Sequence, residues 1–231
     1  MWSAFGQSVN TYFAWLTERV GADRVVEMAE RLGIVFRAAS DERLARHGAR
    51  EWGPFTLGVS ATTPLDLANA YATVAADGRW CAPLPVVRIT DAAGRPVAAA
   101  SPDCRQAVAR DVARAAVDAA RCPVGDRSMY QGCEGGTAED LRARLGRPVA
   151  GKTGSSEGYG TESIVAATPQ LAVAAIATNP DDPQDPVGHA VQKRMTTAVA
   201  ELMSLALQGQ PVRDFVPPSE VTAFETARRG E

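Results

Sequence analysis

Lysine is almost absent from this sequence of 231 residues. Of its 24 basic residues, only Lys152 and Lys193 are lysines. The arginine bias, together with abundant alanine, glycine and valine, is typical of high-GC coding, and it makes each lysine informative. Histidine is also scarce, and His47 and His189 form no recognisable constellation with other residues. A net charge of −3 gives no electrostatic case for binding nucleic acid or an anionic membrane surface.

Long apolar runs are lacking as well. No stretch approaches the ~20 apolar residues that a membrane helix needs. The first ten residues, MWSAFGQSVN, lack the basic start and the apolar core of a signal peptide. A hydrophobic content of 45% is ordinary for a folded globular protein, and the length suits one large domain or two small ones. Neither a repeat nor a linker divides the chain.

The four cysteines include no C-x-x-C pair, so a zinc site is not indicated, and no metal or organic cofactor is expected. They are either buried free thiols or, in a protein that works outside the cytosol, two disulfides. Three pairings are possible, and we favour the sequential one. Cys81–Cys104 would then clamp a hairpin, and Cys122–Cys133 would close a loop.

Apolar spacing and cap residues predict a mixture of helices and strands. Residues 35–60 are polar and irregular and read as loop. The tail from Gln208, which contains three prolines, is expected to be loose. The predicted helices are Asn10–Val20, a second capped by Asp23 and closed by Gly33, one capped by Thr63 and stopped by Gly78, Arg105–Arg121, Thr137–Leu145, and Gly188–Leu207 with Val191, Met195, Val199, Leu202 and Leu205 on one face. The predicted strands are two within residues 85–100 around a turn at Gly94, then Pro148–Thr153, and an antiparallel hairpin of Ser163–Thr168 and Leu171–Thr178.

The stretch from Gly146 to Thr153 satisfies the phosphate-loop pattern G-x-x-x-x-G-K-[ST]. A phosphate loop needs an apolar strand before it and a helix after it, because the helix N-terminus and the loop amides surround the phosphates. Here the preceding residues, AEDLRARLG, are helical and charged, and the following GSSEGYG holds three glycines. We therefore interpret the match as coincidental.

Lys152-Thr153-Gly154 also belongs to a different signature. K-T-G occurs with S-D-N and S-x-x-K in β-lactamases and penicillin-binding proteins. A second member is present as Ser8-Val9-Asn10, in the form S-x-N. Taken alone, Ser8 and Asn10 could simply cap a helix, and Lys152 could be a solvated strand end.

Three longer segments resemble the transpeptidase domain of bifunctional (class A) penicillin-binding proteins, in the order of that family. They are AFGQSVNTYFAWLTERVGADRVVEMAERLGI, TLGVSATTPLDLANAYATVAADGRWCAP and ATPQLAVAAIATNPD. The resemblance implies an α+β fold of the penicillin-binding protein and serine β-lactamase type, incomplete here, with three C-terminal strands of an antiparallel sheet, packing helices and a helical subdomain. It gives residues 1–207 as a partial transpeptidase domain and 208–231 as a disordered tail. A high-GC Gram-positive source fits the arginine bias.

The resemblance also implies a role for each motif residue. Ser8 would relay a proton to the departing amine, Asn10 would hold the acyl segment, and Lys152 would aid the relay and attract the substrate carboxylate. The hydroxyls of Thr153 and Ser155 would bind that carboxylate, and the Ser155 N–H would supply half of an oxyanion hole. Gly154 would keep the strand edge open to the substrate.

The family's nucleophile, the serine of S-x-x-K, is not found in this sequence. Val149 stands three residues before Lys152, and Ala190 three before Lys193. We expect the motif upstream, in a longer protein anchored at the extracytoplasmic face of the membrane through an N-terminal segment. The expected partners are peptidoglycan stem peptides and β-lactams, and the chain alone is expected to be marginally stable and inactive. The alternative is a degenerate, non-catalytic module that binds cell-wall peptides or a protein partner.

Overall fold

The computed structural model describes residues 1–231 except 87, 98–101, 130–132, 183–184 and 220–231. Its helices are α1 (Trp2–Gly6), α2 (Asn10–Val20), α3 (Ala22–Arg31), α4 (Ala39–His47), α5 (Pro64–Ala75), α6 (Arg110–Ala120), α7 (Leu141–Leu145) and α8 (Ala190–Ala206), with short 3₁₀ turns η1 (Ala49–Glu51), η2 (Gly53–Leu57), η3 (Cys122–Val124) and η4 (Glu157–Tyr159). Its strands are β1 (Arg79–Cys81), β2 (Ile89–Thr90), β3 (Pro96–Val97), β4 (Cys104–Gln106), β5 (Ala150–Ser155), β6 (Thr161–Ala167) and β7 (Ala172–Thr178).

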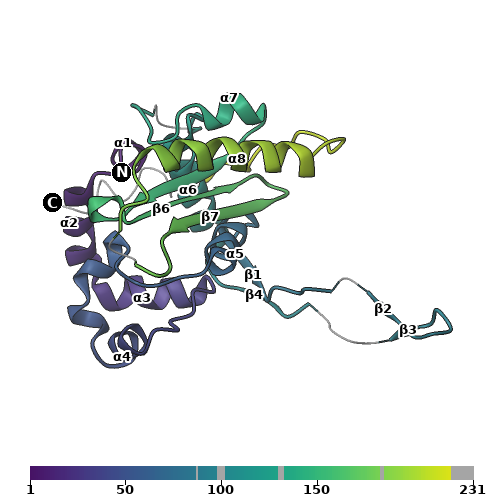
Figure 1. Ribbon diagram of the computed structural model, residues 1–231, viewed down its shortest axis with the longest axis horizontal. Helices are drawn as coiled ribbons and strands as arrows, with labels where there is room; N and C mark the ends of the chain where they lie inside the picture. The colour runs from purple at the N-terminus through teal and green to yellow at the C-terminus, as the bar shows by residue number, and fades with distance from the viewer. Residues whose placement is uncertain (87, 98–101, 130–132, 183–184, 220–231) are drawn as a thin grey trace.

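The centre of the molecule is an antiparallel sheet in the order β5-β6-β7, which confirms the three predicted C-terminal strands. Helices α7 and α8 cover one face of this sheet, and α5 and α6 lie on the other (Figure 1). The main core fills the α8 side, where side chains of β6 meet those of α7 and α8. Its fully buried members are Val124, Leu141, Val149, Ile164, Ala166 and Met203.

A helical lobe precedes the sheet, as expected, but its details differ from the prediction. Residues 35–60 form α4 and two 3₁₀ turns rather than a loop. Their sparse apolar residues are enough, because Phe36 and Trp52 pack with Val26 of α3 into a separate small core. The expected cap at Asp23 is also wrong: α3 begins at Ala22 after Gly21, so Asp23 lies in the first turn.

The helix α5 follows its sequence signals closely. Thr63 caps it by accepting a hydrogen bond from the Asp66 N–H at 3.1 Å, and Pro64 occupies the first helical position. The predicted helix from Arg105 starts later, at Arg110, because residues 104–106 form β4 and pair with β1. The predicted helix over 137–145 is shorter, beginning only at Leu141.

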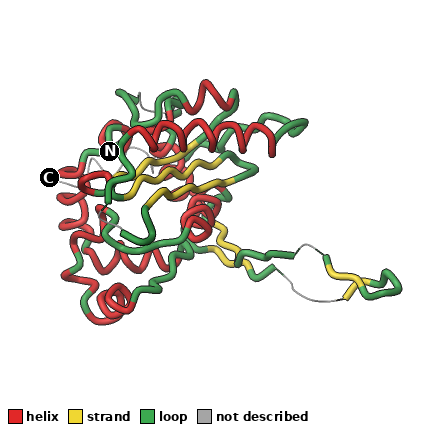
Figure 2. Tube along the Cα trace, viewed as in Figure 1, coloured by secondary structure: helices red, strands yellow, loops and turns green. Residues whose placement is uncertain are grey.

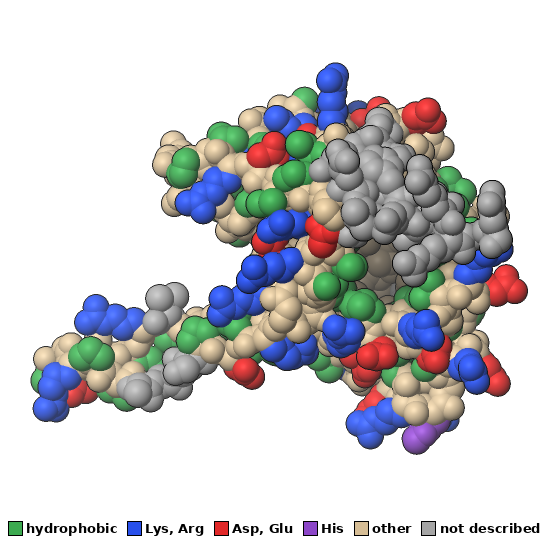
Figure 3. Space-filling view, turned by 180° about the vertical axis from the view of Figure 1, so that it is seen from behind, with side chains coloured by type: hydrophobic (Ala, Val, Ile, Leu, Met, Phe, Trp, Pro, Cys, Tyr) green, Lys and Arg blue, Asp and Glu red, His purple; other side chains and the backbone are tan. Residues whose placement is uncertain are grey.

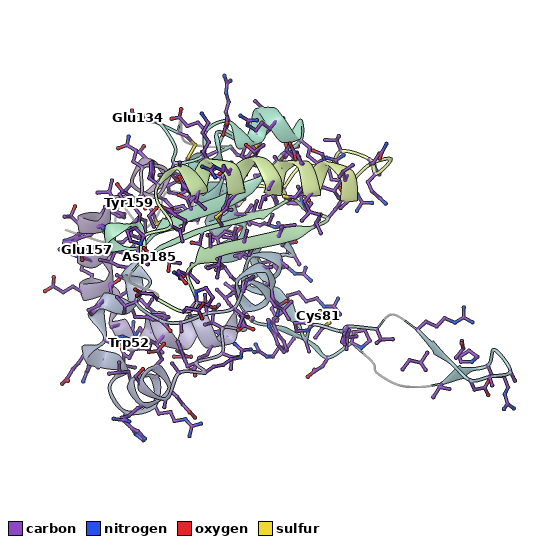
Figure 4. The ribbon with its side chains drawn as sticks, in the orientation of Figure 1. Trp52, Cys81, Glu134, Glu157, Tyr159 and Asp185 are labelled. Carbon is purple, nitrogen blue, oxygen red and sulfur yellow. A yellow bond between two sulfur atoms is a disulfide. The ribbon has the colours of Figure 1, made fainter. Side chains whose placement is uncertain are left out.

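A narrow arm projects from the body between β1 and β4 (Figures 1 and 2). It carries the predicted strand pair, β2 and β3, near its tip; residues 87 and 98–100 of that prediction lie outside the described residues. Cys81 and Cys104 are opposite each other in the β1–β4 register and form a disulfide, as predicted. Cys81 is seen at the root of the arm in Figure 4, and Figure 3 shows both basic and apolar side chains on the surface of the arm.

Two C-terminal features depart from the helical pattern expected there. On α8 the buried residues are Gln192, Thr196, Val199, Ala200 and Met203, whereas Leu202 and Leu205 are exposed. The buried face of α8 is therefore rotated about the helix axis relative to the predicted apolar face. Leu202 and Leu205, which the prediction placed on the buried face, point to solvent. After α8, residues 211–219 have no regular structure, yet Phe215 is buried against Val117, Ala120 and Ala150. That part of the expected loose tail is packed, and its remainder, 220–231, lies outside the described residues.

None of the helices in the described ranges combines the length and the apolar character needed to cross a bilayer.

Candidate active site

Ser8 lies in the tight connection between α1 and α2. The Ser8 N–H donates to Phe5 O at 3.2 Å and the Val9 N–H to Ala4 O at 2.9 Å, the two bonds of a Schellman motif that ends α1. The motif places Ser8 in the left-handed region with φ 57°, where glycine is usual. α2 then starts after Val9, without a side-chain cap. Ser8 is therefore not a helix cap; its hydroxyl is held for another contact.

That contact is Lys152. The Lys152 Nζ donates to Ser8 Oγ at 2.8 Å and to Thr153 O at 2.8 Å, and it lies 5.9 Å from the centre of the Phe5 ring. Burial lowers the pKa of Lys152 from 10.5 to about 8, because the ammonium is partly withdrawn from water. Lys152 and Ser8 are 144 residues apart in the sequence, yet they lie close enough for a proton to pass between them.

The strand position of Lys152 excludes a phosphate loop, as predicted. It lies in the middle of β5, paired with Val165 of β6, and β5 continues through the 3₁₀ turn η4 into β6 rather than into an α-helix. Close packing against the neighbouring strand explains two glycines of this segment instead. A Cβ on Gly151 would lie 2.4 Å from Val165 O, and one on Gly154 would lie 2.5 Å from Ser163 Oγ. A side chain at Gly154 would displace the Ser163 hydroxyl on the neighbouring strand, a reason for glycine distinct from the substrate access expected from the resemblance.

β5 is an edge strand within the described part of the chain, because its only sheet neighbour there is β6. The Ser156 N–H donates to Thr161 O at 2.9 Å, which directs the backbone of Ser156 toward β6. Backbone groups alternate along an antiparallel strand, so the N–H of Ser155 is directed to the open edge. The open edge thus presents the Ser155 N–H three residues after Lys152, beside the Thr153 carbonyl that Lys152 Nζ contacts.

Thr153 is buried, and its hydroxyl lies 2.5 Å from that of Thr137. The loop that carries Thr137 is fixed at its start by the predicted disulfide Cys122–Cys133 and by a hydrogen bond from Gln7 Nε2 to Glu134 O at 2.5 Å. The second disulfide therefore holds a loop against both the α1 end and the K-T-G strand.

Ser155 is exposed, but its hydroxyl donates to Glu162 Oε2 at 2.6 Å. Glu162 is completely buried on β6, and its other oxygen lies 3.8 Å from Nδ1 of His189, just before α8. The ring of His189 in turn lies 5.2 Å from that of Tyr159. In Figure 4, Tyr159 and Glu157 lie at this end of the sheet.

The structure thus brings Ser8 next to the C-terminal half of β5, which carries Lys152, Thr153, Gly154 and Ser155. Asn10 is the first residue of α2 and exposed, and the described contacts include no hydrogen bond of its side chain. Sequence reasoning missed Phe5, Thr137, Glu162 and His189. Only Glu162 carried a signal in the sequence. It stands two residues before Ile164 and four before Ala166, so the period of two in a strand places its carboxylate on the same buried face as these apolar residues.

In the described part of the chain, no three histidine, cysteine or acidic side chains gather as metal ligands would. The groups available for chemistry are a serine hydroxyl, a half-buried amine and an open strand edge.

Known proteins resemble this chain in sequence. The family described as penicillin binding protein transpeptidase domain matches residues 1–203. Penicillin-binding protein 1A of Aquifex aeolicus (strain VF5) is 25% identical over 218 residues, which cover 94% of this chain and 27% of that protein. Penicillin-binding protein 2D of Bacillus subtilis (strain 168) is 27% identical over 219 residues, which cover 95% of this chain and 29% of that protein. The chain therefore spans less than a third of the length of either relative.

Solved structures agree on the fold. The PonA1 protein of Mycobacterium tuberculosis in complex with penicillin V superposes with a TM-score of 0.75 at 23% identity, covering 97% of this chain and 60% of that one. Penicillin-binding protein 1A of Haemophilus influenzae has a TM-score of 0.75 at 18% identity, covering 95% of this chain and 36% of that one. The chain belongs to the family of penicillin-binding protein transpeptidase domains.

Proposed function

We propose that this chain is the C-terminal part of a serine-type peptidoglycan D,D-transpeptidase of the class A kind, which cross-links stem peptides through an acyl-serine intermediate. The observation that carries the proposal is the 2.8 Å contact between Lys152 Nζ and Ser8 Oγ beside the open edge of β5. A hydroxyl and an amine at this distance are suited to pass a proton to the amine that leaves during acylation.

The open edge of β5 suits an extended peptide. Such a peptide adds to a sheet edge through backbone hydrogen bonds, with side-chain contacts giving specificity. The Ser155 N–H at that edge is available as an oxyanion donor. Lys152 attracts the terminal carboxylate of the peptide, next to Thr153 and Ser155, and Asn10 at the start of α2 contacts the acyl segment.

The nucleophile belongs to a segment upstream of this sequence. The chain has no S-x-x-K, and it spans only 27% to 29% of the two curated relatives. The longer protein carries that motif and an N-terminal anchor, and it works on the extracytoplasmic side of the membrane, where the two disulfides are stable. A high-GC Gram-positive source remains part of this proposal.

β-Lactams are the second expected ligand class, since the solved PonA1 structure holds penicillin V. The test is labelling with a fluorescent penicillin. We expect the full-length protein to form a stable covalent adduct and the isolated 231 residues to form none. Lys152→Ala in the full-length protein should slow labelling by about 100-fold or more. Lys193→Ala, which removes the other lysine from an exposed face of α8, is the matched control and should change nothing.

Stable labelling of the isolated chain would contradict the upstream nucleophile. Equal labelling of the Lys152→Ala and Lys193→Ala variants would contradict the role of Lys152.

A further inference from the structure

Glu162 is a charged side chain in a place where charge is costly. It is completely buried on β6, directly across from Ser155 of β5. Its Oε2 accepts the Ser155 hydroxyl at 2.6 Å, whereas its Oε1 has no hydrogen-bond partner among the described residues. A buried carboxylate oxygen without a donor calls for an explanation.

The surroundings of Glu162 supply only partial compensation. His189 Nδ1, at 3.8 Å from Oε1, is beyond hydrogen-bond distance but close enough for a charge interaction when the imidazole is protonated. His189 also stands at the N-terminal end of the 17-residue helix α8, where the helix dipole favours an anion. The segment before α8 is fixed to the same corner, because the Val187 N–H donates to Tyr159 O at 3.0 Å.

The direction of the hydrogen bond from Ser155 to Glu162 determines what the Ser155 hydroxyl can offer to a ligand. An ionised carboxylate only accepts hydrogen bonds. The single proton of the Ser155 hydroxyl is therefore committed to Glu162, and the hydroxyl presents only oxygen lone pairs to the open edge of β5. Lone pairs repel a ligand carboxylate and suit a ligand N–H.

We propose that Glu162 is a specificity-determining positioning residue: by taking the Ser155 proton it weakens recognition of a ligand carboxylate at the K-T-G strand, and His189 opposes this effect. The inference rests on the proposed function, which places Ser155 at the carboxylate end of the site. It adds that Ser155 does not donate to the ligand in the resting arrangement and that removing the charge of Glu162 is a gain of function.

The decisive variant is Glu162→Gln in the full-length protein. The glutamine keeps the shape, and its amide N–H donates to Ser155 Oγ, which frees the serine proton for the ligand. The rate constant of acylation is measured with benzylpenicillin, which carries a carboxylate, and with its neutral methyl ester. We expect Glu162→Gln to accelerate the reaction with benzylpenicillin about fivefold or more, and the reaction with the ester less than about twofold.

Three further variants separate this mechanism from general electrostatics. Glu157→Gln removes the same charge from an exposed position in the neighbouring turn η4 and should leave both rates nearly unchanged. His189→Lys, at a side chain that is 68% exposed, places a permanent cation near Glu162 and should also favour the carboxylate ligand. In a Ser155→Ala background, both gains should disappear, because no hydroxyl proton remains to be redirected.

The outcomes are distinguishable. A wild-type protein that reacts with neither penicillin overturns the proposed function and this inference together. A reactive wild type overturns the inference alone if Glu162→Gln slows benzylpenicillin or matches Glu157→Gln, or if the gains persist without the Ser155 hydroxyl. Should Glu162→Gln fail to fold, His189→Lys decides: no selective gain for the carboxylate ligand contradicts the inference.

Discussion

Ser8 is the residue at which stability and chemistry oppose each other. Its backbone has φ 57° at the Schellman end of α1, a conformation that costs a residue with a Cβ about 1–2 kcal/mol. Glycine would remove that cost but would also remove the hydroxyl that accepts from Lys152. A serine in this position indicates that the hydroxyl is kept at the expense of stability.

We therefore expect Ser8→Gly to be more stable than Ser8→Ala by about 1 kcal/mol, although both lose the same hydrogen bond. Urea denaturation of the two variants measures the difference. Both should lose penicillin labelling equally in the full-length protein. An alanine variant as stable as the glycine variant would show that the backbone of Ser8 is not strained.

Lys152 should give the protein an unusual dependence on alkaline pH. Its pKa is lowered from 10.5 to about 8 in the folded state by burial, so between these values the unfolded chain binds more protons than the folded chain. Stability then rises with pH in this window, and the penalty is fully present below pH about 8. Each pKa unit corresponds to ~1.4 kcal/mol, but Lys152 is only partly withdrawn from water, so we expect a gain on the order of 1 kcal/mol.

The comparison of wild type with Lys152→Met isolates this effect, since methionine keeps the apolar stem without a charge. The difference in unfolding free energy between the two proteins should shrink as pH rises from 8 to 10.5, and Lys193→Met should show no such trend. A constant difference across that range would mean that Lys152 is not buried as a cation.

At the scale of elements, the two disulfides stabilise different parts of the molecule. Cys81–Cys104 closes the base of the arm, far from Ser8, whereas Cys122–Cys133 holds the loop whose Thr137 contacts Thr153. Replacing either pair by alanines should lower stability by about 2–4 kcal/mol. Only the Cys122→Ala/Cys133→Ala protein should also react more slowly with penicillin, by roughly tenfold, because the K-T-G strand loses a lateral support.

The arm pair is thus the matched control for the loop pair, and stopped-flow acylation in the full-length protein measures both. Equal rates for the two double variants would contradict the assigned role of the 133–137 loop.

The elements predicted best are those whose signals are local. α5 shows a cap at Thr63 and a proline at Pro64, and both act as expected. The three strands of the sheet were predicted from short apolar runs, because their hairpin connection is itself a local feature. The segment 35–60 was missed, since α4 and its turns depend on packing of Phe36 against Trp52, contacts that no local pattern specifies.

The site shows the same division. The motifs gave Ser8 and Lys152, and their 2.8 Å contact confirms that they face each other. Thr137 and His189 belong to no motif and reach the site only through the fold, from a loop and a helix start. Which face of α8 is buried could not be predicted either, because the exposed Leu202 and Leu205 are as apolar as the residues that the helix buries.

At the scale of the whole molecule, the C-terminal segment ties distant parts together. Phe215 packs against α6 and β5, and Asp214 pairs with the buried Arg121 at 3.1 Å. Arg121 also pairs with Asp126, whose carboxylate accepts the Val149 N–H just before β5. The segment after α8 therefore braces the entry to the K-T-G strand.

Phe215→Ala should lower the free energy of unfolding by about 3 kcal/mol, the usual cost of emptying a buried aromatic site. Val216→Ala is the control, because Val216 is 53% exposed in the same segment. Chemical denaturation distinguishes the two. A Phe215→Ala protein as stable as Val216→Ala would show that the segment is not docked in solution.

The central claim is that Ser8 and Lys152 act as one proton-transfer unit. A double-mutant cycle on the acylation rate of the full-length protein tests it most directly, using Ser8→Ala, Lys152→Ala and the double variant with a fluorescent penicillin. Residues that act as a unit are strongly non-additive, so the double variant should react about as fast as the slower single variant. If the rate of the double variant fell by the product of the two single losses, Ser8 and Lys152 would act independently, and the central claim would be wrong.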